Sequence, residues 1–325
     1  MAKSEMDIVD ELVSLEAIRG AAARIAPYVV KTPLLAMIPS GLWLKAENLQ
    51  PIGAFKIRGA FNALLSLSGE ERARGVIAHS SGNHAQAVAY AAQRLGVKAV
   101  IVIPDNAPPV KLAATRRCGA EVVLVPFLGN ARTETCARLA REHGYVVIEP
   151  FDSRTIIAGT GTIGLEILEQ KPDVEAVFVP VSGGGLISGI SAAIKQSNPA
   201  IRVIGVEPEF ANDAQQSLRA GRIVRVAPEE TVRTIADGLR VSQVGAIPWA
   251  HIRRDVDDVI TVSEEQIRAA MRRIAGEARL IAEPSGAAAA AGALASGVAL
   301  DKAVAIVSGG NVEPALYASI LEGSS

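Results

Sequence analysis

The sequence predicts an α/β fold whose mostly parallel, twisted sheets are covered by helices on both faces. Short runs rich in β-branched residues alternate along the chain with longer, alanine-rich amphipathic runs. The strand runs are apolar almost throughout, as buried parallel strands are. Several of them lead through glycine or proline into a helix, so ligand-binding groups are expected at the carboxyl ends of the strands.

Each element follows from this alternation. Strands are assigned to short Val/Ile-rich runs, and helices to longer runs whose apolar residues recur every three or four positions. The expected strands are 42–47, 75–79, 99–103, 121–125, 145–149, 176–181, 202–207 and 303–308. The expected helices are 6–26, 56–67, 85–95, 110–118, 132–143, 156–170, 186–196, 264–279 and 285–295.

The length of 325 residues is sufficient for two lobes. Because the chain contains neither a low-complexity linker nor a convincing repeat, two lobes must arise from chain topology. We expect a large lobe from 1–65 and 150–325, with a small lobe, 66–149, inserted into it.

The composition limits the class of partner. The net charge is -1, which gives no electrostatic reason to expect nucleic acid or an anionic membrane. No signal-like core lies at the N-terminus, and the most apolar late run is too short to span a bilayer. Cys118 and Cys136 fit no metal or redox spacing, so a cytoplasmic setting is expected.

Lys56 lies at an expected helix start, between Phe55 and Ile57 and flanked by Gly53 and Gly59. Most lysines are solvated surface charges. Here the apolar neighbours and the close backbone approach favour a partly desolvated amine. A buried ammonium is costly, and condensation with an aldehyde removes that charge chemically.

The turn 182–186 carries three consecutive glycines between an expected strand and an expected helix. Backbone N–H groups in such a turn converge on a phosphate, helped by the helix dipole. A plain strand–helix turn needs only one or two glycines, and no P-loop lysine follows here. Together with Lys56, the turn indicates a phosphorylated aldehyde cofactor held as a Schiff base.

A third glycine-rich segment, 159–164, matches the dinucleotide-binding fingerprint letter by letter. No strand leads directly into it, and no acidic ribose ligand follows at the right place. Close packing between helices is therefore the favoured role of these glycines.

Polar residues also follow two other expected strands. Residues 79–84 read His-Ser-Ser-Gly-Asn-His, and their hydroxyl, amide and N–H groups suit a substrate carboxylate, whereas simple helix capping needs only one of them. A serine in this segment is also a candidate acid/base group. Ser308 is a candidate partner for the nitrogen of a bound pyridine ring. A hydroxyl there would not keep that nitrogen protonated, which favours β-elimination.

Glu207 and Asp213 flank a short loop with an exposed carbonyl between them. Such oxygens suit a hard divalent cation. Acidic loops are more often simply solvated, so the spacing of these residues alone favours a solvated loop over a metal site.

With these residues assembled, the chain resembles the fold-type II pyridoxal-phosphate enzymes, whose fold is tryptophan synthase β-like. Within them it is similar to the threonine/serine dehydratase and serine racemase branch. The resemblance covers nearly the whole chain. It rests on Thr32-Pro33-Leu34, Lys45-Ala46-Glu47-Asn48, residues 79–84, Ala158-Gly159-Thr160-Gly161-Thr162, Thr234-Ile235-Ala236-Asp237-Gly238-Leu239, Glu283-Pro284 and Ser308-Gly309-Gly310-Asn311.

The resemblance implies a role for each matching residue. Lys56 would form the Schiff base, Phe55 would pack beside the ring, Asn83 would bond the phenolic oxygen, and Ser308 would meet the ring nitrogen. The implied phosphate ligands are Gly183, Gly184, Gly185 and Leu186. The implied carboxylate-binding residues are Ser80, Ser81, Gly82 and His84, and Ser81 would be the second acid/base group. The implied Mg or Mn ligands are Glu207, the carbonyl of Ala211, and Asp213.

Two positions bear on the substrate. The family motif has serine where this chain has Ala54, and relatives acting on 3-hydroxyaspartate-like substrates are similar there. Arg132 lies where related enzymes have an arginine near the active site, and it would attract a second carboxylate; a solvated arginine at a helix start is the alternative. The chain stops soon after Asn311, so the C-terminal regulatory domain of biosynthetic threonine dehydratases is not expected.

The resemblance implies a dehydratase that converts L-threonine or L-serine to a 2-keto acid and ammonia by β-elimination. The alternatives are a 3-hydroxyaspartate dehydratase, a serine racemase and, from another class, a non-catalytic ligand-binding protein. The expected partner is a small-molecule amino acid. A homodimer is the default assembly.

Overall fold

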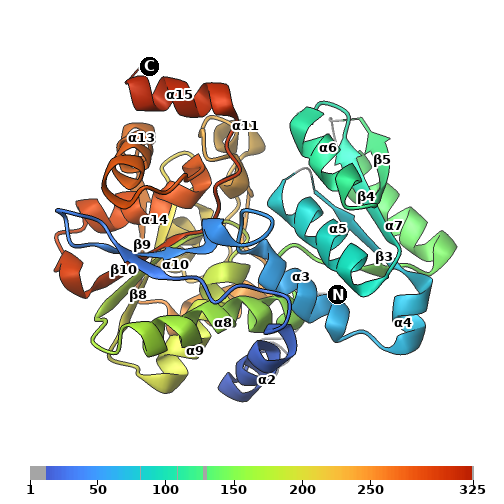
Figure 1. Ribbon diagram of the computed structural model, residues 1–325, viewed down its shortest axis with the longest axis horizontal. Coiled ribbons are helices and arrows are strands. Elements are labelled where there is room, and N and C mark those ends of the chain that lie inside the picture. Colours follow the sequence, from blue (N-terminus) through green and yellow to red (C-terminus); the bar gives the residue numbers. More distant parts are fainter. Residues whose placement is uncertain (1–11, 81, 108, 127–129, 324–325) are drawn as a thin grey trace.

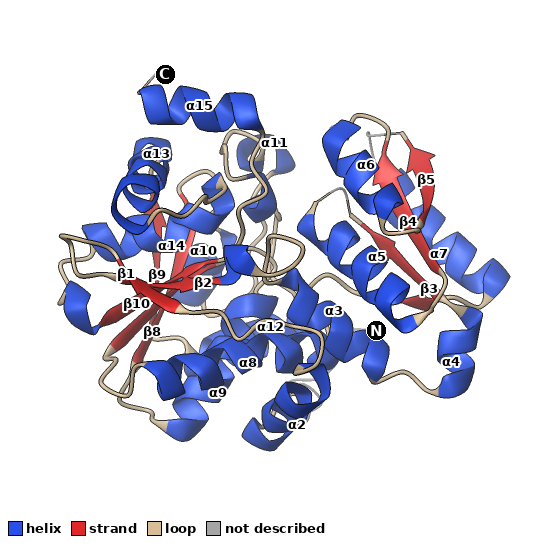
Figure 2. Cartoon of the chain, in the orientation of Figure 1, coloured by secondary structure: helices blue, strands red, loops and turns tan. Residues whose placement is uncertain are grey.

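The computed structural model describes residues 12–80, 82–107, 109–126 and 130–323. Within them, helices and strands alternate, and the strands form a six-stranded and a four-stranded sheet. Figures 1 and 2 show the two sheets side by side, each flanked by helices, with helix α3 (Lys56–Leu65) between the two groups of elements. The predicted α/β class is confirmed.

The larger sheet has the strand order β1-β2-β10-β7-β8-β9. Its strands run parallel except β1, which pairs antiparallel with β2. Its strands are β1 (Leu34–Ala36), β2 (Trp43–Ala46), β7 (Ala176–Pro180), β8 (Arg202–Pro208), β9 (Asp258–Val262) and β10 (Ala303–Val307).

The smaller sheet has the order β5-β4-β3-β6 and is parallel throughout. Its strands are β3 (Val76–His79), β4 (Ala99–Pro104), β5 (Glu121–Val125) and β6 (Val146–Val147). This sheet lies wholly within the range 66–149 predicted for the small lobe.

The α-helices, apart from α3, are α2 (Leu15–Ile25), α4 (Gly69–Arg74), α5 (Asn83–Leu95), α6 (Pro109–Arg117), α7 (Ala131–His143), α8 (Arg154–Gln170), α9 (Gly185–Ser197), α10 (Asp213–Ala220), α11 (Pro228–Thr231), α12 (Ala246–Asp255), α13 (Glu264–Arg273), α14 (Pro284–Ala295) and α15 (Pro314–Glu322). The short helices are η1 (Glu47–Leu49), η2 (Asp237–Leu239), η4 (Leu300–Lys302) and a π-helical turn, η3 (Ile274–Ala278).

Both faces of the larger sheet are buried. Helices α13 and α14 pack on one face, and α8, α9 and α12 pack on the other. The alanine-rich sequence of α14 allows this helix to approach the sheet closely: a Cβ on Gly292 would lie 2.6 Å from Val206. Because the chain has few aromatic residues, its core reaches a high packing density through the close approach of backbones and small side chains.

The smaller sheet is covered in the same way. Helices α3 and α5 pack on one face, and α7 packs on the other around the buried thiol of Cys136. Since α3 also packs against α8, it contacts the helical layers of both sheets. The residue at its first position, Lys56, is thereby placed between the two sheets.

Some elements differ from the prediction. The helix expected at 6–26 begins at Leu15 in the described chain, because the Ser14 hydroxyl caps it by accepting from the N–H of Ala17; residues 6–11 lie outside the described residues. Only Val146 and Val147 of the expected strand 145–149 pair with β3. The sequence reading did not anticipate β1, β9 or the helices α4, α10, α11, α12 and α15, which are short or mix charged with apolar residues.

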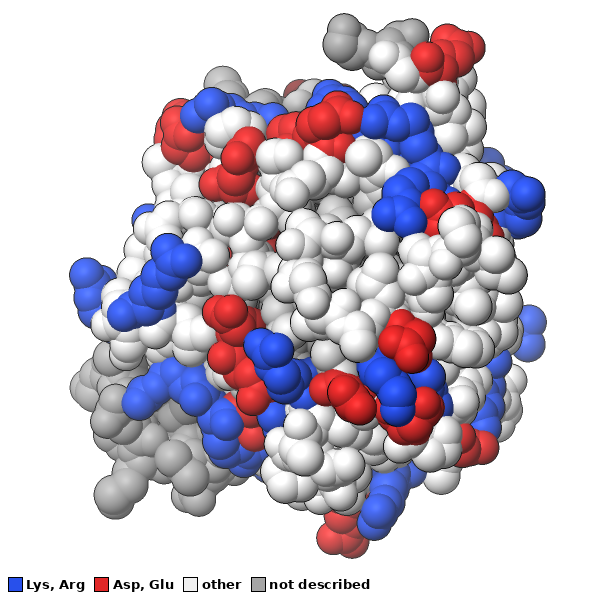
Figure 3. Space-filling view, turned by 90° about the vertical axis from the view of Figure 1, so that its left-hand side faces the viewer, with Lys and Arg blue, Asp and Glu red and all other residues white. Residues whose placement is uncertain are grey.

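The surface is mixed in charge. Figure 3 shows Lys and Arg side chains interspersed with Asp and Glu on the face that it draws. Among the described residues, the structure contains no helix that is both long and apolar enough to cross a membrane.

Candidate active site

Segments that follow the carboxyl ends of strands from both sheets meet around Lys56. In the larger sheet, the neighbouring strands β10 and β7 lead into 308–311 and 183–185. In the smaller sheet, the neighbouring strands β3 and β6 lead into 80–83 and 148–151. Ligand sites in open α/β sheets form at these edges.

The amine of Lys56 lies in an apolar setting. Its Nζ donates a hydrogen bond to the carbonyl of Pro150 at 2.6 Å and lies 5.3 Å from the ring centroid of Phe55. Burial lowers the pKa of Lys56 to about 8. About a tenth of the amine is therefore neutral, and hence nucleophilic, at pH 7, far more than for an ordinary lysine.

The glycine turn after β7 leaves the first amides of α9 uncovered. The first intrahelical bond of α9 runs from the Ser188 N–H to the Gly184 carbonyl, so the N–H groups before it have no acceptor within the helix. Gly184 has a φ of 90°. A Cβ on Gly183 would lie 2.3 Å from the Phe151 ring, and one on Gly184 would lie 2.7 Å from Pro248. Leu186 is buried in the first turn of α9.

The residue after Phe151 fixes a second helix beside this turn. The carboxylate of Asp152 accepts from the N–H groups of Ala246 and Ile247 at the start of α12. Gly245 in turn donates its N–H to the Gly183 carbonyl at 3.1 Å. The segment that bears the partner of Lys56 is therefore joined to the candidate phosphate site.

Asn83 connects the smaller sheet with the larger one. It lies at the first position of α5, and its Nδ2 donates to Glu283 Oε1 at 2.7 Å. Its Oδ1 accepts from the Nδ2 of Asn311 at 2.8 Å, and the same Asn311 nitrogen also donates to the Ile52 carbonyl. Gly309 passes close by, since a Cβ there would lie 2.2 Å from Glu283 Oε1.

Ser308 is buried at the end of β10, and its carbonyl accepts from the N–H of Phe55 at 3.0 Å. An isolated bridge pairs Ala54 with Gly309, and Gly310 donates to the Gly53 carbonyl. The backbone that carries Lys56 is thus bonded directly to the segment that carries Ser308.

The loop after β3 combines open space with a neutral histidine. Ser80 accepts through its Oγ from the N–H of Gly82, and a Cβ on Gly82 would meet nothing within 4 Å. Ser81 lies outside the described residues. His84 is buried and its Nε2 lies 2.9 Å from the Ile148 carbonyl. Burial, reinforced by the charge of Lys56, lowers the pKa of His84 to about 3, so this ring stays neutral.

Arg132 and His79 form a second polar pair at the smaller sheet. Burial lowers the pKa of His79, and the positive charge of Arg132 lowers it further. His79 Nδ1 is buried without a hydrogen-bond partner, and Arg132 makes no ion pair within the described residues.

Glu207, near the end of β8, and Asp213, at the start of α10, form a buried pair. Their side chains are 0% and 1% exposed. Glu207 accepts from the N–H groups of Ala214 and Gln215, but neither carboxylate oxygen of Asp213 has a hydrogen-bond partner among the described residues. Burial raises the pKa of both groups, that of Asp213 to about 7, although the backbone N–H groups of Asp213 and Val244 act in the opposite direction without reaching hydrogen-bond geometry. Ala211, which lies between them in the sequence, is also buried.

This pair has two acidic side chains and no third. No cluster of three or more His, Cys, Asp or Glu residues with metal-binding geometry occurs in the described residues. A cation at this place would need the Ala211 carbonyl as a further oxygen ligand, as Ca²⁺ and Mg²⁺ sites often have.

A buried ion network holds the helix of Lys56 from its other side. Arg58 is 0% exposed and contacts Glu47 at 2.8 Å and Glu166 at 2.7 Å. Lys45, equally buried, contacts Glu166 at 2.6 Å. The network ties the first turn of α3 to β2, η1 and α8, which limits the movement of Lys56.

The sequence identified most of the residues that meet here, but not all of their partners. The Pro150 carbonyl, Phe151 and Asp152 carry no recognisable motif and act through backbone or packing. Glu283 and Asn311 belong to the resemblance motifs, yet their contacts with Asn83 depend on the tertiary fold. The glycines 159–164 lie inside α8, where they allow close packing on α3 and α9, so the packing interpretation is confirmed.

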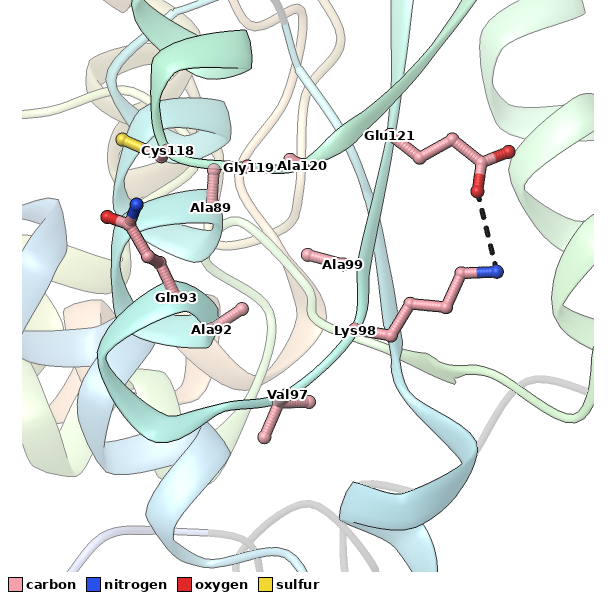
Figure 4. Close-up of a pocket in the computed structure, with 10 residues that line it drawn as sticks. All are labelled: Ala89, Ala92, Gln93, Val97, Lys98, Ala99, Cys118, Gly119, Ala120 and Glu121. Atoms are coloured by element: carbon pink, nitrogen blue, oxygen red, sulfur yellow. Dashed lines mark ion pairs between the residues drawn. The ribbon is translucent and has the colours of Figure 1, made fainter.

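Two hollows lie away from these residues. One, of about 340 Å³, lies between α5 and the edge of the smaller sheet, with Cys118 and the Lys98–Glu121 ion pair on its wall (Figure 4). The other, of about 510 Å³, lies between α2, α3 and the start of α8 and is lined by Arg24, Asn62 and Arg154, among others. Neither includes the residues predicted to bind the cofactor.

The fold and the site define a class of protein: an α/β enzyme with a partly desolvated lysine beside a glycine turn that suits phosphate. Residues 25–309 match the family described as "Pyridoxal-phosphate dependent enzyme". The chain belongs to this family of PLP-dependent enzymes.

Named relatives cover nearly the whole chain. It is 42% identical to the L-threo-3-hydroxyaspartate ammonia-lyase of Saccharomyces cerevisiae, over 93% of this chain and 94% of the relative. It is 44% identical to the L-threonine ammonia-lyase of Thermotoga maritima, over 93% of this chain and 76% of the relative. The solved structure of maize serine racemase has a TM-score of 0.90 at 41% identity and covers 96% of this chain and 98% of that one. The predicted family and fold type are confirmed.

Proposed function

We propose that this protein is a PLP-dependent ammonia-lyase that eliminates water from a β-hydroxy amino acid and releases a 2-keto acid and ammonia. The observation that supports this proposal most strongly is the position of Lys56. Its amine has a pKa of about 8 and lies where the two sheets meet, beside the glycine turn. The relatives named as ammonia-lyases support this reaction class.

The residues present fit the cofactor. Pyridoxal phosphate, when bound, supplies an aldehyde for amines and a ring that accepts electrons from the Cα–H bond. Lys56 would hold the aldehyde and the first amides of α9, including Gly184, Gly185 and Leu186, the phosphate. Asn83 would hold the ring hydroxyl and Ser308 the ring nitrogen. The uncovered amides of α9 favour this fit.

The remaining chemistry belongs to the protein. Lys56, once displaced by the substrate amine, is placed to remove the Cα proton because its depressed pKa leaves a neutral amine. We assign the substrate carboxylate to the loop with Ser80, Ser81 and Gly82, where there is open space next to the Gly82 Cα. Ser81 is proposed to serve the opposite face, where returning a proton would give racemisation.

The proposed reaction does not specify the substrate side chain, and one observation favours 3-hydroxyaspartate as a second candidate substrate. The positive charge of Arg132 contributes to the lowered pKa of His79, and His79 Nδ1 has no hydrogen-bond partner among the described residues. A β-carboxylate would satisfy both, as in 3-hydroxyaspartate, which the named Saccharomyces cerevisiae relative acts on. L-threonine and L-serine have no group that would do so.

The deciding experiment measures 2-keto acid release from L-threonine, L-serine, D-serine and both 3-hydroxyaspartate diastereomers, with pyridoxal phosphate and Mg²⁺ present. We expect turnover of at least one β-hydroxy amino acid and none by Lys56→Ala. Unchanged turnover by Lys56→Ala would refute the assignment of the lysine. If no 2-keto acid is released from any of the five substrates, the ammonia-lyase proposal is refuted.

Arg132→Gln separates the two substrate classes. If Arg132 binds a second carboxylate, KM for 3-hydroxyaspartate should rise by about tenfold or more, while KM for L-threonine stays within about twofold, because charge-assisted hydrogen bonds contribute about 1.5–3 kcal/mol. Arg138→Gln, an exposed arginine on the same helix, is the matched control. An equal effect on both substrates would show that Arg132 only supports the structure.

We further propose a structural Mg²⁺ or Mn²⁺ bound by Glu207, the Ala211 carbonyl and Asp213. The unpartnered carboxylate oxygens of Asp213 support it, because a buried carboxylate without a hydrogen bond is costly unless a cation or a proton neutralises it.

We also propose that the protein works as two lobes, 1–65 with 150–325 and 66–149, and as a cytoplasmic homodimer. The confinement of the smaller sheet to residues 76–147 supports the division. The free thiols of Cys118 and Cys136 suit a reducing compartment.

A further inference from the structure

The loop between the two proposed acidic cation ligands is stacked against a second loop. The guanidinium carbon of Arg233 lies 3.9 Å from the ring centroid of Phe210, which follows Glu207 by three residues. Arg233 also pairs with Glu230 at 2.5 Å. The guanidinium is thus held over the ring by a neighbouring carboxylate, at the surface of the molecule.

Phe210 adjoins the proposed carbonyl ligand. Ala211 follows it directly, is 1% exposed, and donates its N–H to the Pro208 carbonyl at 3.0 Å. The half-buried Phe210 ring is therefore the surface anchor of the short backbone segment that carries the proposed carbonyl ligand. Removing the ring's partner would loosen that carbonyl.

On the other side of the stack, Arg233 begins a segment that leads to the candidate active site. The N–H of Ile235 donates to Glu264 Oε2 at 2.7 Å, and the N–H of Gly238 donates to Ser285 Oγ at 2.9 Å. Ser285 lies in the first turn of α14, two residues after Glu283. Glu283 in turn accepts from Asn83.

We propose that the Arg233–Phe210 stack couples cation binding at Glu207, Ala211 and Asp213 to the order of segment 234–238 beside the active site. The inference rests on the proposed cation site. Coupling of this kind is reciprocal: a contact that orders the segment when the cation binds also strengthens cation binding. Arg233 and Phe210 are positioning residues, since neither touches the cation or the substrate.

The test is the affinity of the holoenzyme for MgCl₂, measured by isothermal titration calorimetry. Phe210→Leu and Arg233→Gln should each raise the Mg²⁺ Kd by about two- to fivefold, the range of an exposed cation–π contact. The double variant should be no weaker than the weaker single variant, because both changes break one contact. Arg219→Gln, which removes an equal charge from the exposed surface of nearby α10, should leave the Kd unchanged.

Hydrogen exchange supplies a readout that a loss of charge alone would not change. In the native protein, Mg²⁺ should slow exchange at the amides of Ile235 and Gly238, and in Arg233→Gln this slowing should be largely lost. Additive effects of the two single changes on the Kd, or equal slowing in both proteins, would overturn the coupling.

The same titration distinguishes a failure of the proposed cation site from a failure of the proposed coupling. If Asp213→Asn abolishes Mg²⁺ binding while Arg233→Gln and Phe210→Leu leave the Kd unaltered, the cation site stands and the coupling is wrong. If the native protein binds no Mg²⁺, both are wrong. Release of 2-keto acid, assayed separately, decides the ammonia-lyase proposal in either case.

Discussion

At the scale of the residue, the candidate site is defined by buried groups whose charged forms are disfavoured rather than by ion pairs. Lys56 bonds a carbonyl and His84 contacts another, and burial is the largest cause of the depressed pKa of each. The nearby side chains of Arg58 and Lys45 differ, because each forms an ion pair with a carboxylate. The proposed chemistry therefore depends on the neutral fraction of the Lys56 amine, and the ion network of Arg58 and Lys45 supplies structural support.

The pKa of His84 predicts a pH dependence of stability. The ordinary pKa of 6.5 falls to about 3 in the folded protein, so between these values the unfolded chain binds more protons. Stability should therefore fall as pH decreases through this window, by up to about 1.4 kcal/mol per pH unit.

Urea unfolding at pH 7 and pH 5 measures this effect. His84→Gln keeps a donor for the Ile148 carbonyl but cannot be protonated, so it should lose about 1–2 kcal/mol less than the native protein between the two pH values. The same loss in both proteins would mean that His84 is not the responsible group.

At the scale of the element, the position of Lys56 depends on how closely α3 packs on α8. A Cβ on Gly159 of α8 would lie 2.7 Å from the Arg58 carbonyl and 2.9 Å from the Cα of Gly59. These are backbone atoms, so the helices would have to separate. Glycine at 159 therefore controls the spacing of the two helices.

Gly159→Ala should destabilise the protein by about 1–3 kcal/mol through overpacking, as measured by urea unfolding. Gly20→Ala is the matched control: it lies within α2, a Cβ there would meet nothing within 4 Å, and it should be neutral or stabilising by up to about 1 kcal/mol. A neutral Gly159→Ala would contradict the tight α3–α8 contact.

The elements themselves were largely predictable. Long amphipathic runs and buried Val/Ile runs gave correct helices and strands within a few residues, because their periodicity reflects burial directly. The edge strands β1 and β9 were missed because an edge strand has a weaker apolar pattern, and α12 because Pro248 interrupts its first turn. The roles predicted for residues at glycine turns and strand ends remain predictions, whereas the contacts of Pro150 and Glu283 require knowledge of which strands are neighbours.

At the scale of the whole molecule, a structural cation would stabilise the larger sheet. If Mg²⁺ binds at Asp213 as proposed, a concentration about 100 times the Kd should add about 2.7 kcal/mol to the free energy of unfolding. Asp213→Asn should remove this increment, which differential scanning calorimetry with and without Mg²⁺ would measure. Stabilisation that persists in Asp213→Asn would place the cation elsewhere.

The strand order has a consequence for biosynthesis. The smaller sheet is contiguous, from Val76 to Val147, but β2 joins the rest of the larger sheet only through β10, near the end of the chain. As the chain emerges from the ribosome, the smaller sheet is able to fold early, while β2 and Lys56 wait for residues 303–311. We therefore expect the candidate active site to assemble only after β10 and residues 308–311 have been synthesised.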